Sequence, residues 1–375
     1  MRSYWESKHF GQWEVVVVGA GLVGLATALA VRARLPSASI LLLERGLLAS
    51  GATGRNAGFA CFGSLTELLS DVDSVGWDAT LALVERRFRG SQALLARVGA
   101  QGAGYEHTGG WELIEPHTVG VLDRLEEVER ALRPVLGAGA VLLDDARIGE
   151  FGFSGARVPH LVSLPREGAL DSGRLMRTLL RACGAADITV WTGADVKAVA
   201  SEGENVRVEV GDLSLRAKHV AVCTNAFTRA LLPNLDVTPG RGQVLVTDPV
   251  PGLAFRGVFH LDEGFVYFRE VDGRVLLGGG RNLDFTGEAT TEIQTTERIQ
   301  AYLDDLLRDV ILPGRTVTVS HRWAGIMAFG ASKAPIVRTV APGVAVGVRM
   351  GGMGVALGSG VAEELADLIV GSGRL

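Results

Sequence analysis

The sequence is poor in cysteine, in charge and in long uncharged segments. Its three cysteines, Cys61, Cys183 and Cys223, are odd in number and far apart, which excludes a metal cluster of the CxxC type. Scattered thiols of this kind are typical of reduced cytoplasmic proteins. Glu6 and Lys8 interrupt the first residues, so we expect no signal peptide. These features predict a cytoplasmic protein without a bound metal.

The charge is low and nearly balanced. Charged residues make up 21% of the chain and the formal net charge is -5, so there is no electrostatic reason to expect a nucleic-acid partner. No internal repeat and no low-complexity tract is visible. Hydrophobic residues make up 47% of the 375 residues, which is enough for a large core and for two domains.

One uncharged run needs a separate explanation. Residues 15–31 carry no charge over 17 positions, which is the lower limit for a membrane-spanning helix. The run starts with four valines and then contains Gly19, Gly21 and Gly24, a pattern that favours a buried strand, a glycine turn and a helix. We therefore expect no membrane span.

Strand and helix signals indicate an α/β protein. A strand at 14–18, a helix at 22–34 and a strand at 39–44 form a βαβ unit, which implies a parallel sheet. The chain ends in a similar unit, with a strand at 343–349, a glycine turn and a helix at 355–370. The segments between them are predicted as a mostly helical region at 72–145 with a strand near 111–115, helices at 171–183 and 291–309, and strands at 188–192, 196–200, 206–210, 219–224, 242–248, 264–270 and 274–280.

The first chemical motif is Gly19-x-Gly21-x-x-Gly24, which follows a strand and opens a helix. Glu44 lies 20 residues after the last glycine, at the predicted end of the second strand. This arrangement is the dinucleotide-binding fingerprint, in which the pyrophosphate lies at the helix N-terminus and the acid binds the ribose hydroxyls. A negative ribose partner favours FAD or NAD over NADP.

Two further glycine-rich segments favour a flavin over a nicotinamide. Residues 51–64 read GATGRNAGFACFGS, a small-residue loop that can approach a flat ring, and Thr53, Arg55 and Asn56 can donate hydrogen bonds to phosphate or ring oxygens. Residues 349–354 read RMGGMG and precede the last helix, whose N-terminal dipole would favour negative charge on a reduced flavin. Each segment alone could equally be a structural loop or turn.

Taken in order, these motifs resemble the D-amino-acid-oxidase-type flavoproteins, which include glycine oxidase, sarcosine oxidase and γ-glutamylputrescine oxidase. GAGLVGLATALA and GATGRNAGF carry the likeness at the N-terminal end. GALDSGRLMRTLL, HVAVCTNAFTRALLP, GRVLLGGG and RWAGIMAFGASKAPIV continue it through the chain. The resemblance implies a Rossmann-like FAD-binding domain interleaved with an α+β substrate domain that contains a mostly antiparallel sheet. It places the FAD-binding domain at residues 1–70, 155–235 and 330–375, and the substrate domain at 71–154 and 236–329.

The resemblance also implies a set of FAD contacts. In addition to the glycines and the ribose acid, it places backbone contacts to adenine at Val196. The predicted cofactor-binding residues are Gly19, Gly21, Leu22, Val23, Gly24, Glu44, Arg45, Thr53, Arg55, Asn56, Ala57, Val196, Gly351, Gly352, Met353 and Gly354.

The implied reaction is oxidation of the C–N bond of an amine or amino acid, with hydride transfer to flavin N5 and hydrolysis of the imine. Oxygen or an electron carrier would reoxidise the flavin. The predicted substrate contacts are Tyr267, Arg281, His321, Arg322 and Trp323, although each could have a purely structural role. Relatives that oxidise amino acids tend to carry an arginine shortly after the W-x-G glycine, where this chain reads Gly325-Ile326-Met327-Ala328. Either the substrate lacks that carboxylate, or Arg281 or Arg322 binds it.

Three other functions fit the same sequence. A dehydrogenase of the same fold would pass its electrons to a quinone or a carrier protein. A flavin-binding protein without enzymatic activity, or a nicotinamide-dependent dehydrogenase of the Rossmann type, would also carry the N-terminal motif.

Overall fold

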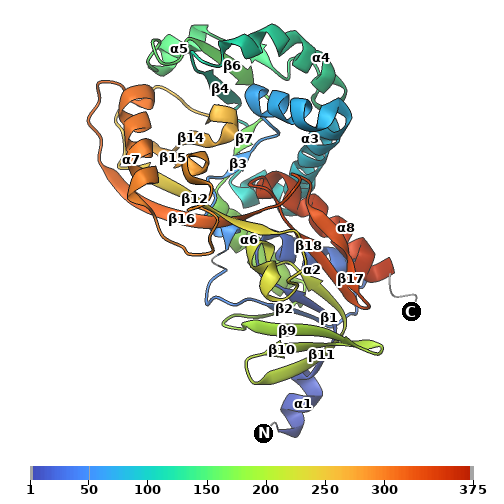
Figure 1. Cartoon of the computed structure of the whole chain (residues 1–375). Helices are drawn as coiled ribbons and strands as arrows, with labels where there is room; N and C mark the ends of the chain where they lie inside the picture. Colours follow the sequence, from blue (N-terminus) through green and yellow to red (C-terminus); the bar gives the residue numbers. More distant parts are fainter. Residues whose placement is uncertain (1–2, 50, 372–375) are drawn as a thin grey trace.

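The computed structural model describes residues 3–49 and 51–371. Residues 1–2, 50 and 372–375 lie outside this description. They include both outer ends of the predicted FAD-binding domain. Two large sheets form the molecule, and Figure 1 shows them at opposite ends, with helices α3 and α8 running between them.

The first sheet contains the N-terminal βαβ unit. Its central strands β18, β11, β1, β2 and β8 are parallel, and β17 and the β9–β10 pair extend it with antiparallel pairings. The valines at 15–18 are at most 4% exposed, as expected for a strand covered on both faces. The strands are β1 (Gln12–Val18), β2 (Ile40–Leu43), β8 (Thr189–Trp191), β9 (Val196–Glu202), β10 (Asn205–Val210), β11 (Leu213–Val222), β17 (Ile336–Ala341) and β18 (Val344–Val348).

The second sheet is mostly antiparallel, in the order β16-β12-β15-β14-β13-β4-β6-β5, and only β13 and β4 pair in parallel. An Asp272-Gly273 turn joins β14 to β15, and both residues have positive φ (51° and 70°), as a tight hairpin requires. The strands are β4 (Gly110–Ile114), β5 (Leu142–Leu143), β6 (His160–Leu164), β12 (Thr238–Thr247), β13 (Val258–Leu261), β14 (Val266–Val271), β15 (Arg274–Gly279) and β16 (Val319–Phe329).

The helices confirm most of the sequence pattern. Helix α6 begins where expected, because the Asp171 carboxylate accepts the Arg174 amide hydrogen at 2.8 Å. None of the helices in the described part of the chain has the length and hydropathy needed to cross a bilayer. The α-helices are α1 (Tyr4–Phe10), α2 (Leu22–Arg34), α3 (Leu65–Ala103), α4 (Leu125–Leu136), α5 (Ala146–Phe151), α6 (Ser172–Ala185), α7 (Glu297–Leu306) and α8 (Gly354–Gly371).

Two parts of the pattern were wrong or incomplete. The helix predicted at 291–309 begins only at Glu297, because the Gln243 side chain accepts the Thr296 amide hydrogen at 2.8 Å and holds the preceding residues outside the helix. Strands β6, β13, β16 and β17 were not predicted. The domain limits stay a prediction, and β6 pairs with β4 in the second sheet although it falls within the 155–235 segment.

The short elements complete the connections. A two-stranded sheet, β3 (Phe59–Ala60) with β7 (Gly168–Ala169), lies between the two large sheets. The remaining turns are η1 (Ala52–Gly54), η2 (Val119–Arg124), η3 (Asn225–Ala230), η4 (Asp262–Gly264), η5 (Arg281–Asp284) and η6 (Leu307–Ile311).

Candidate active site

Two glycines of the first motif are required by the fold itself. Gly19 has φ of 102°, and a Cβ atom there would lie 2.9 Å from the Cys223 carbonyl oxygen. At Gly24 a Cβ atom would lie 1.9 Å from the Gly19 carbonyl oxygen, so α2 could not pack against the end of β1. These glycines shape the turn and the close helix packing that a dinucleotide site needs.

Gly21 differs from both. Its backbone is extended (φ -77°, ψ -177°), which any residue can adopt, and a Cβ atom would meet only the Thr53 hydroxyl, at 3.2 Å. The missing side chain therefore leaves the N-terminus of α2 open. Thr53 lies beside this opening, and its hydroxyl accepts the Leu22 amide hydrogen at 2.9 Å. Val23, one residue further, packs on α8 instead.

Glu44 directly follows β2 and lies beside this opening. One carboxylate oxygen accepts the Ala20 amide hydrogen at 3.0 Å and the other accepts the Gly46 amide hydrogen at 2.9 Å. Each oxygen keeps a second lone pair for a ribose hydroxyl. The Ala194 amide donates to the Glu44 carbonyl at 2.8 Å, which brings the start of β9 at Val196 close to the same turn.

The neighbouring Arg45 is exposed at this end of the site. Its guanidinium lies 4.1 Å from the centre of the Phe227 ring. This cation–π contact fixes the side chain beside the Glu44 turn.

The loop at 51–64 is shaped by Asn56. The Asn56 amide nitrogen donates to the carbonyls of Ala52 and Thr53, and its oxygen accepts hydrogen bonds from the Gly58 amide and the Ser172 hydroxyl, both at 2.8 Å. The side chain is thus used within the protein, in contrast to the expectation that it donates to a ligand. Ala57, which follows it, is 8% exposed.

Both remaining glycine-rich segments lie against β16. Arg55 donates to the Ala324 carbonyl at 3.0 Å, and the Trp323 indole donates to the Arg55 carbonyl at 2.9 Å. The Gly351 amide donates to the Ala328 carbonyl at 3.0 Å.

The C-terminal turn next to this contact needs its glycines. Gly351 and Gly352 have φ of 56° and 82°, a backbone region that favours glycine. Met353 and Gly354 then lead into α8, whose first amides have no acceptor within the helix. One strand therefore aligns both segments that were predicted to contact the flavin.

The face of the second sheet that carries Tyr267 is low in side chains. A Cβ atom at Gly278 would lie 2.6 Å from the Tyr267 ring, and one at Gly242 would lie 3.9 Å from its hydroxyl. The Tyr267 hydroxyl has no hydrogen-bond partner among the described residues. Burial raises the pKa of Tyr267 to about 12, so the hydroxyl stays protonated and can donate.

Arg281 lies on the same face, among aromatic rings. Its guanidinium carbon is 4.0 Å from the centre of the Phe329 ring and 4.7 Å from that of Phe285. Within residues 3–49 and 51–371 no carboxylate forms an ion pair with it, and burial lowers its pKa. Its Cδ atom would lie 3.5 Å from a Cβ at Gly240, two residues along β12 from Gly242, so Arg281 and Tyr267 lie over the same face of β12.

The other predicted substrate contacts separate into two groups. Trp323 packs in the same cluster as Tyr267. Arg322 points to the opposite side of β16, where it donates to Gln300 and to both oxygens of Asp304 at 2.6–2.9 Å. His321 is exposed. The structure thus places Tyr267, Arg281 and Trp323 on one sheet face, whereas Arg322 points away from it and His321 is exposed further along β16.

A buried polar cluster beside this face was not predicted from the sequence. His260 Nε2 lies 2.7 Å from a Glu167 oxygen, and Cys61 lies within 4.8 Å of both. Burial alone would lower the pKa of His260, but the Glu167 carboxylate raises it above its usual value. Phe59 packs edge-on against His260 and Tyr267, each at 5.5 Å. No spacing signal links positions 61, 167 and 260, and only the register of β13 places His260 here.

Comparison with known proteins agrees with the expected family. Residues 14–368 match the family model described as FAD dependent oxidoreductase (DAO). No curated protein matches the sequence. Similar solved structures include L-proline dehydrogenase from P. horikoshii (17% identity, TM-score 0.79, 97% of this chain and 95% of that one) and glycine oxidase from Geobacillus kaustophilus (19%, 0.76, 96% and 95%). Iminodiacetate oxidase from Chelativorans sp. BNC1 is also similar (22%, 0.75, 96% and 95%). At these identities the likeness to solved structures concerns the fold.

Proposed function

The chain belongs to the FAD-dependent oxidoreductase family, and from this premise we propose that it oxidises the C–N bond of a small amino acid. The proposal concerns the substrate class, which family membership leaves open. Its main support is Arg281, a partly buried guanidinium without a carboxylate partner in the described part of the chain, on the same sheet face as Tyr267.

The residues around the first glycine motif fit the dinucleotide part of FAD. The open N-terminus of α2 at Gly21 offers amide hydrogens to a pyrophosphate, and Glu44 retains lone pairs for ribose hydroxyls. The first turn of α8 offers a second positive helix end. When bound, FAD supplies the acceptor for the hydride.

The chain's own residues would bind and orient the substrate. A carboxylate is best bound by a planar, bidentate guanidinium, and the rings around Arg281 exclude water and strengthen that interaction. Tyr267 would donate a second hydrogen bond from its protonated hydroxyl. Holding the substrate at both points fixes which C–H bond faces the cofactor, and such positioning is the main contribution of the protein.

Arg281 favours an amino acid over an amine that lacks a carboxylate, the other alternative left open by the sequence. A partly buried arginine without a partner is costly unless a ligand supplies the anion. Arg322 already has Asp304 as its partner, so it is the weaker candidate for this role.

The test uses the flavin as its own indicator. Under anaerobic conditions, D- and L-amino acids, N-methyl amino acids and polyamines are compared for bleaching of the flavin spectrum. We expect bleaching by a carboxylate-bearing substrate, and Arg281→Leu should raise its KM about 10- to 150-fold, the loss of one charge-assisted contact. Arg322→Leu is the matched control and should leave KM unchanged. Bleaching by polyamines alone, or equal KM values for both variants, would refute the proposed substrate class.

The electron acceptor is tested in the same experiment. Admitting air to the bleached protein distinguishes an oxidase, which is rapidly reoxidised with formation of peroxide, from a dehydrogenase that needs a quinone or carrier. Absence of bleaching by every compound would instead support a flavin-binding protein without amine chemistry.

A further inference from the structure

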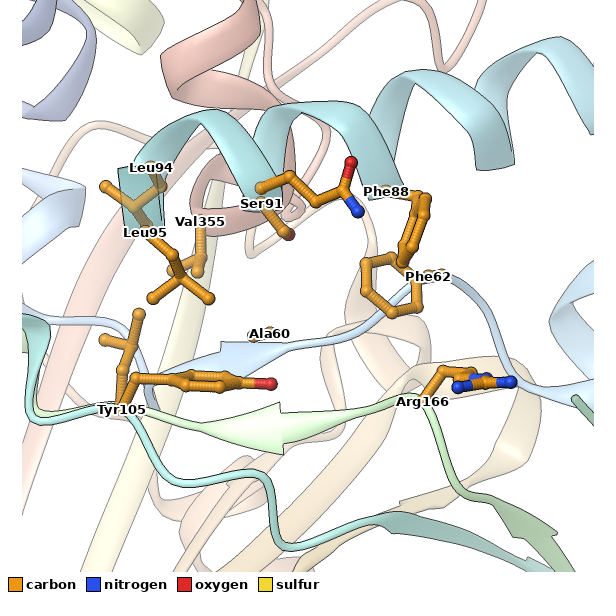
Figure 2. Close-up of a pocket in the computed structure, with 11 residues that line it drawn as sticks. Ala60, Phe62, Phe88, Ser91, Leu94, Leu95, Tyr105, Arg166 and Val355 are labelled. Carbon is orange, nitrogen blue, oxygen red and sulfur yellow. The ribbon is translucent and has the colours of Figure 1, made fainter. Parts of the chain in front are cut away.

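A cavity of about 100 Å³ lies on the far side of β3 from Tyr267. Phe59 of β3 packs against Tyr267, whereas the next residue, Ala60, lines the cavity. Successive strand residues point to opposite faces, so β3 separates the cavity from the sheet face that carries Tyr267. Helix α3 covers it from above, and Val355 in the first turn of α8 lies beside it, as Figure 2 shows.

The polar lining of this cavity can donate but carries no negative charge. Besides apolar side chains it contains Ser91, Gln92, Tyr105 and Arg166, and no Asp or Glu. All four side chains can donate hydrogen bonds. Figure 2 shows Tyr105 and Arg166 at opposite ends of the floor, with Ser91 above them. The lining therefore suits a ligand whose head group accepts hydrogen bonds.

Two of these donors have no partner among the residues that the structure describes. Ser91 is 7% exposed, and its hydroxyl is buried without a hydrogen-bond partner in the described structure. An unsatisfied buried hydroxyl is destabilising, and a bound acceptor would offset that penalty. Arg166 is exposed and forms no ion pair with any described residue. Burial and the nearby Glu167 raise the pKa of Tyr105, so its hydroxyl stays protonated.

The size of the cavity limits the rest of the ligand. A volume near 100 Å³ is smaller than the roughly 150 Å³ cavity that accommodates benzene, so it limits the enclosed part of the ligand to a chain of about three carbons. The walls from Phe62, Phe88, Leu94 and Leu170 are apolar and suit a hydrocarbon chain. We propose that this cavity binds a short-chain aliphatic carboxylate, with the carboxylate toward Ser91, Tyr105 and Arg166 and the chain between the apolar walls.

Such a ligand would join two segments that lie next to the proposed cofactor site. It would touch Ala60, in the loop shaped by Asn56, and Val355, in the first turn of α8. Binding should therefore stabilise the contact between that loop and that helix. This inference does not depend on the substrate class proposed above.

The experiment measures binding of butyrate to the purified holoenzyme by isothermal titration calorimetry, with flavin absorbance recorded in parallel. Acetate lacks the apolar chain and n-butylamine reverses the charge, so both should bind at least tenfold more weakly. Ser91→Ala should weaken butyrate binding by at least about tenfold, through loss of one hydrogen bond to a charged group. Ser91→Leu fills the cavity and should abolish binding. Ser74→Ala, at an exposed position of α3 just before the helix breaks at Gly76, is the control.

The outcomes separate this site from the substrate site. A saturable butyrate site that is lost in Ser91→Leu and kept in Arg281→Leu supports the proposal. No saturable binding at millimolar butyrate overturns it. So does binding that Ser91→Ala and Ser91→Leu leave unchanged, or binding that Arg281→Leu removes. Ser91→Ala guards against a folding defect in the leucine variant, since removing an unsatisfied hydroxyl should not lower stability.

Discussion

Replacing Gly21 with alanine should weaken FAD binding without unfolding the protein. The new methyl group would meet only the Thr53 hydroxyl, at 3.2 Å, and the backbone already has an extended conformation that suits alanine. Such a substitution changes the free energy of unfolding by about 1 kcal/mol or less, often favourably. The same methyl group would lie where the pyrophosphate approaches the N-terminus of α2. Inserting it into that contact should cost about 1–3 kcal/mol, or roughly a 5- to 150-fold increase in the Kd for FAD.

Gly24→Ala provides the contrast. Its methyl group would lie 1.9 Å from the Gly19 carbonyl oxygen, so the strand and the helix would have to separate. This variant should lose folding stability even without FAD. The assay titrates each apoprotein with FAD by flavin fluorescence and measures urea unfolding of the same samples. Wild-type FAD affinity in Gly21→Ala, or equal destabilisation of both variants, would show that the opening at Gly21 is not the phosphate site.

Three further predictions concern buried charges and are tested by urea denaturation. Glu288→Ala leaves the buried Arg241 guanidinium without its carboxylate and should destabilise the fold by about 3–5 kcal/mol. Burial would raise the pKa of Glu67, but Arg87 lowers it to about 2, so its stabilisation is present above pH 4.5 and lost as the pH falls toward 2. Glu67→Gln should cost about 3 kcal/mol at pH 7 and remove this acid dependence. His260 has a raised pKa, so its stabilisation is complete below about pH 6.5 and lost as the pH rises further. His260→Gln should flatten that alkaline loss, and an unchanged pH profile would contradict the assignment.

The ends of the fold could be predicted because their signals are local. The valine run, the glycine turn and the periodic helix at 22–34 determine the first βαβ unit almost by themselves. By contrast, β16 has a mixed burial pattern, and its neighbour β12 lies more than 70 positions earlier in the chain. Such long-range pairing leaves little trace in a short window of sequence.

The candidate site likewise contains residues that a local pattern predicts and residues whose roles depend on the folded structure. Gly19, Gly24 and Glu44 follow from a spacing that the nucleotide-binding turn requires. Arg281 and Arg322 could not be ranked from sequence, because their roles depend on what faces them. Only the structure places aromatic rings around the first and Asp304 beside the second. Asn56 was assigned to a ligand for the same reason, since the carbonyls that occupy its amide are visible only in the folded loop.

Strand β16 contacts the two flanking glycine-rich segments through main-chain carbonyls, those of Ala324 and Ala328. Carbonyl groups are present whatever the side chain, so these contacts are insensitive to substitution along the strand, except at Trp323, whose indole donates to the Arg55 carbonyl. Met327 and Phe329 can therefore be exchanged to reshape the sheet face of the proposed substrate site while the two segments predicted to bind FAD stay aligned. Substitutions at these two positions, engineered or natural, should thus change substrate specificity without loss of FAD.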